Sequence, residues 1–254
     1  MSEPLHVLIT AGASGIGLAM ARGFTARGDK VHICDISPGA LGAAVEELPG
    51  IATTLADVSR RPQVERLFDE LERNWGKLDV LVNNAGIAGP TAPVEAIDPQ
   101  DWEETMAVNI NGQFYCARRA VPLLKASQGA MINLSSAAGR FGFPLRTPYA
   151  ASKWAVRGFT ESLAMELGPA GVRVNAILPG VVAGERINRV IGAKAEARGI
   201  SFEEQQAEML SRVSLRRMVS AEDIANMALF LCSPVGANIS GQALSVCGNV
   251  EVLQ

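Results

Sequence analysis

Histidine is scarce in this sequence: only His6 and His32 occur among its 254 residues, and both lie near the start of the chain. A hydrolase built on serine, histidine and aspartate needs a histidine base, and zinc sites usually draw on clusters of histidine and cysteine. Neither arrangement is available further along the chain, so we expect no metal site. Acid–base chemistry in this protein needs another type of residue.

Cysteine is also rare, and no two cysteines form a C-x-x-C pair. The four residues are Cys34, Cys116, Cys232 and Cys247. Scattered thiols are typical of reduced packing residues, which indicates a cytoplasmic protein. The opening Met1–Pro4 lacks a basic region followed by a long apolar run, so we expect no signal peptide.

Long runs of one kind of residue are missing as well. No apolar stretch approaches the roughly 18 residues of a membrane-spanning helix. The net charge is −3, and like charges form no run. The sequence therefore argues against nucleic acid or a membrane as the main partner. Its hydrophobic content of 48% is enough for a large core and leaves apolar surface that a homo-oligomer would cover.

Short apolar runs alternate with amphipathic stretches along the chain. The runs predict seven strands, at Leu5–Ile9, Val31–Ile36, Ile51–Ala56, Leu78–Asn83, Ala130–Leu134, Val172–Leu178 and Ala243–Val246. The stretches between them predict helices at Gly15–Arg27, Gly39–Leu48, Pro62–Trp75, Trp102–Lys125, Tyr149–Leu167 and Ala221–Leu231. Strands that are apolar throughout and separated by helices imply an α/β fold with a parallel sheet covered on both faces.

One segment, Gly184–Met218, interrupts this rhythm with charged helical residues. We expect it to form a small helical insertion over one end of the sheet, in the position of a substrate lid. The rest of the chain contains no linker and no repeat, so the sequence predicts one domain over residues 1–254.

The first predicted strand runs into a glycine-rich turn, Thr10–Gly17, which opens a helix. Such glycines let the backbone approach a pyrophosphate, and the helix N-terminus adds N–H donors. Asp35 ends the second strand, 18 residues after Gly17, where an acid accepts hydrogen bonds from the adenosine ribose and repels a 2′-phosphate. The pattern favours NAD over NADP. A plain connecting turn and a solvated carboxylate are the alternatives.

Tyr149 and Lys153 lie four residues apart, so both face the same side of a helix. An unperturbed tyrosine, with a pKa of about 10, is a poor base at neutral pH. A nearby ammonium stabilises the phenolate and lowers that pKa, which makes tyrosine a workable acid–base group without histidine. Taken alone the pair is commonplace, and chance or surface packing explains most such pairs.

Several further motifs accompany the pair, in a fixed order and spacing. They are Asp57-Val58, Asn83-Asn84-Ala85-Gly86, Asn109, Ser135-Ser136-Ala137-Ala138-Gly139 and Pro179-Gly180. With the glycine-rich turn, they resemble the motifs of the short-chain dehydrogenase/reductase family over nearly the whole chain. Ser136 precedes Tyr149 by 13 residues, the separation usual for the catalytic serine of that family. The resemblance implies a doubly wound Rossmann fold.

The resemblance also implies four catalytic roles. Tyr149 exchanges a proton with the substrate oxygen, and Lys153 lowers the pKa of Tyr149 and holds the nicotinamide ribose. Ser136 hydrogen-bonds the substrate oxygen, with a strand-end cap as the alternative. Asn109 anchors a water that leads from Lys153 to solvent, with a structural kink in its helix as the alternative.

The implied cofactor is NAD, and the implied assembly is a homotetramer or a homodimer. The residues expected to bind the cofactor are Gly12, Ser14, Gly15, Ile16, Gly17, Asp35, Asp57, Val58, Asn84, Ala85, Gly86, Tyr149, Lys153, Pro179, Gly180 and Val182. The sequence departs from the family pattern in three places: Ala11 and Gly184 replace a glycine and a threonine, and Val246-Cys247-Gly248-Asn249 replaces V-D-G-G.

The substrate is the least determined feature. Arg186, and after it Arg140 or Arg146, is a candidate to pair with a carboxylate, sulfonate or phosphate. Solvated or salt-bridged arginines are the alternative. Because NAD usually serves oxidation, we expect a dehydrogenase of an alcohol, a polyol or sugar, or a hydroxy acid. A 3-oxoacyl-thioester (acyl-carrier-protein) reductase and a non-catalytic nucleotide-binding protein are the other hypotheses.

Overall fold

The computed structural model describes residues 3–253, so Met1, Ser2 and Gln254 lie outside the described residues. The expectation that the chain has no signal peptide rests partly on Met1 and Ser2. Seven strands form one sheet in the order β3-β2-β1-β4-β5-β6-β7, and every neighbouring pair is parallel. They are β1 His6–Thr10, β2 Lys30–Asp35, β3 Ala52–Leu55, β4 Val80–Asn83, β5 Ala130–Leu134, β6 Arg173–Pro179 and β7 Ala243–Val246. The predicted α/β fold with about seven parallel strands is confirmed.

The strand order places a switch point beside β1. The chain runs outward from β1 to β3 and then returns to β4 on the other side of β1. In such sheets the connections on either side of the switch point leave in opposite directions, which opens a crevice at the carboxyl ends of the strands. The glycine-rich turn follows β1 directly, so the fold sets that turn at the crevice.

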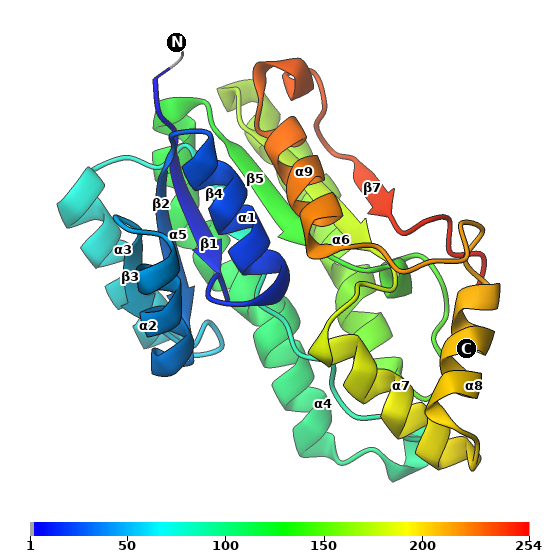
Figure 1. Ribbon diagram of the computed structural model, residues 1–254. Coiled ribbons are helices and arrows are strands. Elements are labelled where there is room, and N and C mark those ends of the chain that lie inside the picture. The colour runs from blue at the N-terminus through cyan, green and yellow to red at the C-terminus, as the bar shows by residue number, and fades with distance from the viewer. Residues whose placement is uncertain (1–2, 254) are drawn as a thin grey trace.

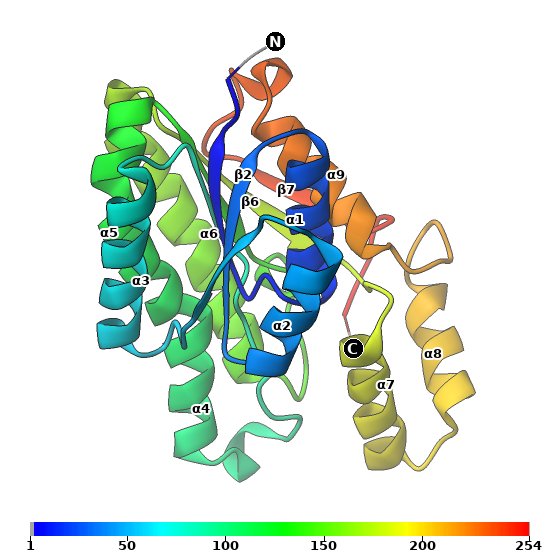
Figure 2. The same cartoon turned by 60° about the vertical axis from the view of Figure 1, so that its left-hand side comes forward.

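Helices cover both faces of the sheet (Figures 1 and 2). The main ones are α1 Gly15–Ala26, α2 Pro38–Glu47, α3 Arg61–Trp75, α5 Gly112–Ser127, α6 Thr147–Leu167 and α9 Ala221–Leu231. Strand side chains alternate between two cores: Val7 and Ile9 pack with α1, α2 and α9, whereas Leu8 packs with α3, α5 and the end of α6. Because both faces of the central strands β1, β4, β5 and β6 are buried, most of their positions are apolar.

The predicted helix Trp102–Lys125 lies within a longer helical stretch that contains a π turn. The helical stretch begins earlier, as α4 Pro99–Met106, and a wider π turn at Ala107–Asn111 separates α4 from α5. A π turn carries one extra residue and is often found at functional sites. Here it contains Asn109, whose side chain is held by the neighbouring backbone, as described below.

The interrupting segment contains two helices, α7 Glu185–Arg198 and α8 Phe202–Ser211, which pack against each other outside the two helical layers (Figure 1). Its two ends meet, because Val182 and Val219 form a parallel bridge. The segment is therefore an excursion that leaves and rejoins the fold at one place. In the described part of the chain, no helix is long and apolar enough to cross a membrane.

Candidate active site

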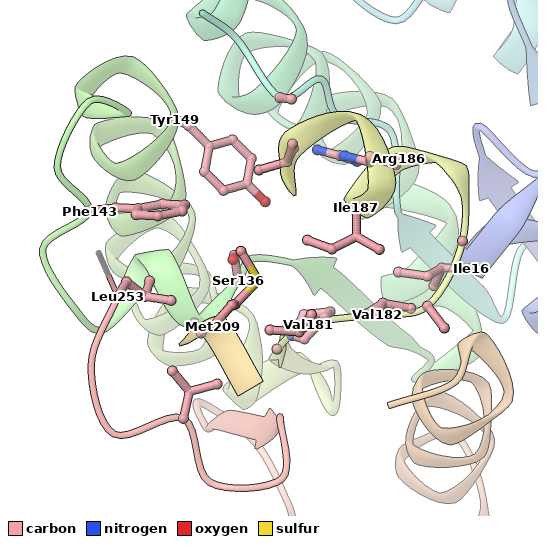
Figure 3. A pocket seen from close by; sticks show the side chains of 18 of the residues that line it. Ile16, Ser136, Phe143, Tyr149, Val181, Val182, Arg186, Ile187, Met209 and Leu253 are labelled. Carbon is pink, nitrogen blue, oxygen red and sulfur yellow. The ribbon is translucent and has the colours of Figure 1, made fainter. Parts of the chain in front are cut away.

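A cavity of about 690 Å³ opens at the carboxyl ends of the strands (Figure 3). Its walls come from the glycine-rich turn, the ends of β4, β5 and β6, the start of α6, and the helices α7 and α8. Side chains from Ile16 to Leu253 converge on it, so it joins segments that are far apart in the sequence. Both histidines lie elsewhere: His6 and His32 pack edge-on against Trp75.

The glycine-rich turn is held by the end of β4. The Thr10 hydroxyl accepts hydrogen bonds from the backbone N–H groups of Asn84 and Ala85, both at 3.0 Å. The Asn84 side chain in turn donates to the carbonyls of Thr10 and Ala11, at 2.9 and 3.0 Å. Two strand ends on either side of the switch point are thus bonded together, which gives the turn a defined shape.

The turn leaves room for a pyrophosphate only because glycine stands at its crowded positions. A Cβ on Gly17 would lie 2.2 Å from the Ala11 carbonyl oxygen, and one on Gly12 would lie 2.5 Å from the Ile33 side chain. Gly15, at φ +51°, faces open space. The side chain of Ser14, at the N-cap of α1, accepts no hydrogen bond from the described helix, so the first-turn N–H groups are available to a phosphate. These residues fit a dinucleotide.

Asp35 and Asp57 are not among the residues of the cavity wall in the described structure. Asp35 is buried, and its carboxylate accepts from the backbone N–H groups of Ala13 at 3.2 Å and Ser37 at 3.1 Å. Asp57 accepts from the backbone and hydroxyl of Ser59. Asp35 therefore braces the turn from the second strand, a contact that places negative charge next to the nucleotide-binding segment.

Asn109 organises the loop that follows β4. Its side-chain oxygen accepts from the Ile87 N–H at 2.8 Å, and its amide nitrogen donates to the Ile87 carbonyl at 3.1 Å and to the Ser152 hydroxyl at 3.0 Å. A Cβ on Gly86 would come within 3.1 Å of Asn109 and 3.2 Å of the Lys153 ammonium. The π turn thus presents Asn109 to a backbone segment that runs past Lys153.

Tyr149 lies in the cavity with its side chain directed toward the same space as Ser136 (Figure 3). Burial raises the pKa of Tyr149. The positive charges of Arg186 and Lys153 and a hydrogen bond with Ser136 lower it by a larger amount, so the pKa of Tyr149 falls below its usual value. The Ser136 hydroxyl also accepts from the Ala138 N–H at 3.1 Å. Ser136 is therefore both a cap and a partner of Tyr149.

Lys153 is buried one helical turn beyond Tyr149. Its ammonium donates to the Leu134 carbonyl at 2.9 Å and lies 5.7 Å from the centre of the Tyr149 ring. Burial lowers the pKa of Lys153 to about 8, against the opposing effect of the Tyr149 phenolate. Tyr149 and Lys153, four residues apart on α6, are brought together with Ser136 from the end of β5.

The three candidate arginines lie in different surroundings. Arg146 is buried in the cavity wall, with its guanidinium 5.3 Å from the centre of the Tyr149 ring. Arg186 extends from α7 and donates to the Gly86 carbonyl at 3.1 Å. Arg140 is exposed, rests on Phe141 and does not belong to the cavity wall within the described residues. Contact between Arg140 and a substrate stays a prediction.

Comparison with known proteins decides the family. A family model described as enoyl-(acyl carrier protein) reductase matches residues 10–249. The chain is 34% identical over 250 residues to 3-oxoacyl-acyl-carrier-protein reductase of Thermotoga maritima, covering 96% of this chain and 97% of the relative. The chain belongs to the short-chain dehydrogenase/reductase family.

Solved structures of this family agree with the fold. NAD⁺-bound xylitol dehydrogenase matches with a TM-score of 0.92 and 28% identity, over 96% of this chain and 98% of the other. A variant of actinorhodin polyketide ketoreductase with NADPH matches with a TM-score of 0.94 and 30% identity, over 99% of each chain. Because the two hold different cofactors, the preference of this oxidoreductase for NAD stays a prediction.

The cofactor residues expected from the family motifs fall into two groups. Those on the cavity wall are Ser14, Gly15, Ile16, Asn84, Gly86, Tyr149, Lys153, Pro179, Gly180 and Val182. Those that shape the surroundings without lining the cavity are Gly12, Gly17, Asp35, Asp57, Val58 and Ala85. Their contact with a bound cofactor stays a prediction.

Each of the three departures from the family motifs has a structural counterpart. Ala11 adopts φ +49°, a left-handed conformation that glycine reaches without strain and alanine does not. Gly184 adopts φ +141° at the N-cap of α7, where a threonine would be strained. Cys247, in the third departure, leaves no space for a Cβ on Gly180, since that Cβ would lie 2.6 Å from the cysteine side chain.

The sequence reasoning missed several residues of the site. Ser135 positions Lys153, because the Ser135 hydroxyl donates to the Lys153 carbonyl at 2.7 Å. The motif alone indicates no role for this first serine. Met209 and Leu253 line the cavity near Ser136 (Figure 3). Nothing in the local pattern marks Met209 or Leu253, because only the tertiary fold returns α8 and the chain end to the cavity.

Proposed function

We propose that the protein is an NAD(H)-dependent oxidoreductase that interconverts an alcohol and its carbonyl, with Tyr149 as the general acid and base. The observation that carries the proposal is the group formed by Ser136, Tyr149 and the buried Lys153 on the wall of one cavity. The substrates we expect are a secondary alcohol, a polyol or sugar, or a hydroxy acid. The xylitol dehydrogenase structure supports this class.

Oxidation of an alcohol removes a hydride from carbon and a proton from oxygen. Bound nicotinamide supplies the site that accepts the hydride. The Tyr149 phenolate takes the proton, and the neighbouring positive charges of Arg186 and Lys153 stabilise that phenolate by lowering the pKa of Tyr149. Ser136 donates a hydrogen bond to the substrate oxygen and stabilises its charge as the proton leaves. In reduction, Tyr149 returns the proton as a phenol.

Other residues hold this arrangement in place. Ser135 and the Leu134 carbonyl position Lys153, while Asn109 holds Ile87 next to Gly86. The π turn at Asn109 supports the predicted role of this residue in a water path from Lys153, because it places Asn109 beside the segment that passes the ammonium. Each contact restricts a side chain to the geometry that proton transfer requires.

The choice of NAD over NADP rests on Asp35. Its carboxylate lies at the turn, held by the Ala13 and Ser37 N–H groups, where it would repel a 2′-phosphate. The xylitol dehydrogenase with NAD⁺ supports this assignment, and the ketoreductase with NADPH supports the opposite one. Wild-type turnover that is faster with NADP than with NAD would overturn it.

A second candidate function is reduction of a 3-oxoacyl thioester on acyl carrier protein. It is favoured by the Thermotoga maritima relative, which is 34% identical over nearly the full length of both chains. Both functions use the same tyrosine and lysine, so the substrate separates them. NADPH-dependent turnover of an acetoacetyl thioester that exceeds the oxidation of every alcohol in a panel would establish the second function in place of the first.

The deciding experiment is a cofactor-reduction screen over alcohols, polyols, sugars and hydroxy acids, with NAD⁺ and NADP⁺ in parallel. We expect NADH formation with at least one class and loss of it in Tyr149→Phe. Tight NADH binding without turnover on the whole panel or on the thioester would instead indicate a non-catalytic nucleotide-binding protein.

We also propose a cytoplasmic homotetramer, with a homodimer as the alternative. Exposed apolar side chains on α5 and α6 support an oligomer: Phe114, Trp154 and Met165 are 48%, 48% and 82% exposed. Burial of such a surface against another copy removes apolar area from water. Light scattering on the purified chain measures the mass directly.

A further inference from the structure

The cavity contains more positive charge than the proposed proton transfer requires. Lys153, Arg146 and Arg186 all influence the ionisation of Tyr149, so three cations surround a single phenolate. In the described structure, neither arginine forms an ion pair with a carboxylate. A buried guanidinium without a counter-charge is unfavourable, which points to a negative group that arrives with the substrate.

Arg146 is the more informative of the two arginines. It is 2% exposed, and one terminal nitrogen donates to the Ala88 carbonyl at 2.6 Å. Its Nε is buried and has no hydrogen-bond partner among the described residues. A guanidinium presents its donors as a planar fork that suits the two oxygens of a carboxylate. A donor of that fork is therefore unused in the wall of the cavity.

The backbone beside Arg146 is strained in a way that holds the side chain in place. Leu145 adopts φ +62°, which is uncommon for leucine, and its carbonyl accepts from the Ala92 N–H at 3.0 Å. The Arg146 backbone N–H donates to the Phe143 carbonyl and closes a turn. The Arg146 guanidinium lies 5.4 Å from the centre of the Phe143 ring and 5.3 Å from the centre of the Tyr149 ring. Strain of this kind persists where the surrounding structure imposes it, often at functional sites.

Further positive charge lies behind Arg146. The Lys194 ammonium is buried and lies 4.2 Å from the centre of the Phe143 ring, on which Arg146 also rests. The two carboxylates on the cavity wall do not face Arg146 as ion-pair partners: Glu208 pairs with Arg198 and Arg212, and Glu185 is exposed at the start of α7. The part of the cavity around Arg146, Arg186 and Phe143, which we call the substrate side, thus carries positive charge around the Phe143 ring.

We propose that the substrate is a short hydroxy acid whose carboxylate binds to Arg146 and Arg186. In such a substrate the carboxylate lies within a few bonds of the reacting carbon. The distance requirement follows from the position of both guanidiniums, 5.3 and 5.9 Å from the centre of the Tyr149 ring. This inference rests on the proposed hydride transfer and narrows it to one substrate class. A long neutral acyl thioester would leave both arginines without a counter-charge.

The test compares each acid with its own neutral ester. The substrates are both enantiomers of 2-hydroxybutanoate and 3-hydroxybutanoate and their methyl esters, each with NAD⁺. We expect kcat/KM for the best acid to exceed that for its ester by roughly 10- to 100-fold, the range of a charge-assisted hydrogen bond. Arg146→Met should lower this ratio by a similar factor, and Arg146→Lys should restore part of it.

Arg140→Met is the matched control, because Arg140 also rests on a phenylalanine of the same loop but lies outside the cavity wall. We expect it to retain the ratio of the wild type. Melting temperatures and NADH titrations show whether each variant is folded. Equal kcat/KM for acid and ester in the wild type, or an equal loss for both in Arg146→Met, would overturn the carboxylate site.

Calorimetric titration with butanoate in the presence of NADH separates this inference from the proposed function. Binding by the wild type that weakens at least roughly tenfold in Arg146→Met supports the anion site, even where no alcohol is oxidised. Equal turnover of the esters and the acids, without butanoate binding, would support hydride transfer and contradict the anion site.

Discussion

The turn after β1 and the cavity wall beside α7 and α8 are built by different means. The turn relies on backbone: Thr10 and Asn84 join the ends of two strands, and Gly17 leaves the space. The substrate side relies on long side chains, with Arg146 and Arg186 beside Tyr149. A backbone site requires few residue types, whereas a site made of side chains can change its ligand by substitution at a few positions.

The same contrast appears in the electrostatics. At the turn, the buried Asp35 carboxylate is satisfied by two backbone N–H groups, at 3.2 and 3.1 Å. On the substrate side, Lys153 and Arg146 are buried, and burial is the main cause that lowers the pKa of each. The Asp35 carboxylate thus has its partners within the fold, whereas we expect the substrate side to gain stability when negative charge enters. Five substitutions test whether the two regions can be perturbed separately.

The largest effect is expected from Tyr149→Phe, which removes the proton acceptor and leaves the turn intact. The turnover number should fall on the order of 1000-fold, within the range of general acid–base catalysis, while the Kd for NADH changes little. Steady-state rates and a fluorescence titration measure the two quantities. Tyr115→Phe is the control, since Tyr115 is the other tyrosine and lies in α5. A Tyr149→Phe variant with more than a tenth of wild-type activity would contradict the assignment.

Asp35→Ala is expected to act on the nucleotide side alone. The ratio of kcat/KM with NAD to that with NADP should fall by roughly 10- to 100-fold, because charge-assisted hydrogen bonds to the ribose disappear together with the repulsion of a phosphate. Asp35→Asn keeps an acceptor and removes the charge, which separates the two causes. An unchanged ratio in both variants would show that the carboxylate only braces the turn.

Gly17→Ala should damage the turn through space rather than charge. Its Cβ would lie 2.2 Å from the Ala11 carbonyl oxygen, so we expect NADH binding to weaken by at least roughly tenfold and unfolding to require about 1–3 kcal/mol less. Thermal unfolding and NADH titration report both. Gly42→Ala, in α2 with nothing near the added Cβ, should instead stabilise by about 0.5–1 kcal/mol. Normal NADH affinity in Gly17→Ala would remove this reading of the turn.

Arg186→Gln tests the electrostatics of the substrate side through the pH profile. Oxidation needs the Tyr149 phenolate, so kcat/KM rises as the pH increases through the pKa of Tyr149. Arg186 holds that pKa below its usual value, and its loss should move the rise to higher pH and lower the rate at neutral pH. Arg189→Gln, on the same helix, should move the profile less. Superimposable profiles for wild type and Arg186→Gln would contradict the role.

The smallest effect is expected from Ala11→Gly. Ala11 lies at φ +49°, where alanine is strained by about 1–2 kcal/mol, and the greater freedom of glycine in the unfolded chain offsets part of the relief. We expect a net gain of up to about 1 kcal/mol in stability, visible as a small rise in Tm. A lower Tm would show that the Ala11 side chain contributes packing that outweighs its strain.

Sequence reasoning succeeded where the pattern is local. Apolar strands at regular intervals predicted the seven-stranded sheet, because a strand buried on both faces is mostly apolar. It did not predict the π turn within Trp102–Lys125, where Asn109 bonds to Ile87, a residue that is distant in sequence. It also named Arg140 and Arg146 together, although one is exposed and the other is buried. Loop residues six positions apart carry no periodic signal of which side they face.

The sequence by itself determined the fold, the family and the pairing of Tyr149 with Lys153, since strand patterning and helical spacing are properties of short segments. Only the tertiary structure decided what surrounds Tyr149. It set Ser136 beside the hydroxyl, brought Arg186 from the excursion at α7, and buried Arg146 with an unused donor. The physical reason is that burial and charge depend on every segment that meets at one place. The lowered pKa of Tyr149 belongs to that assembly rather than to any motif.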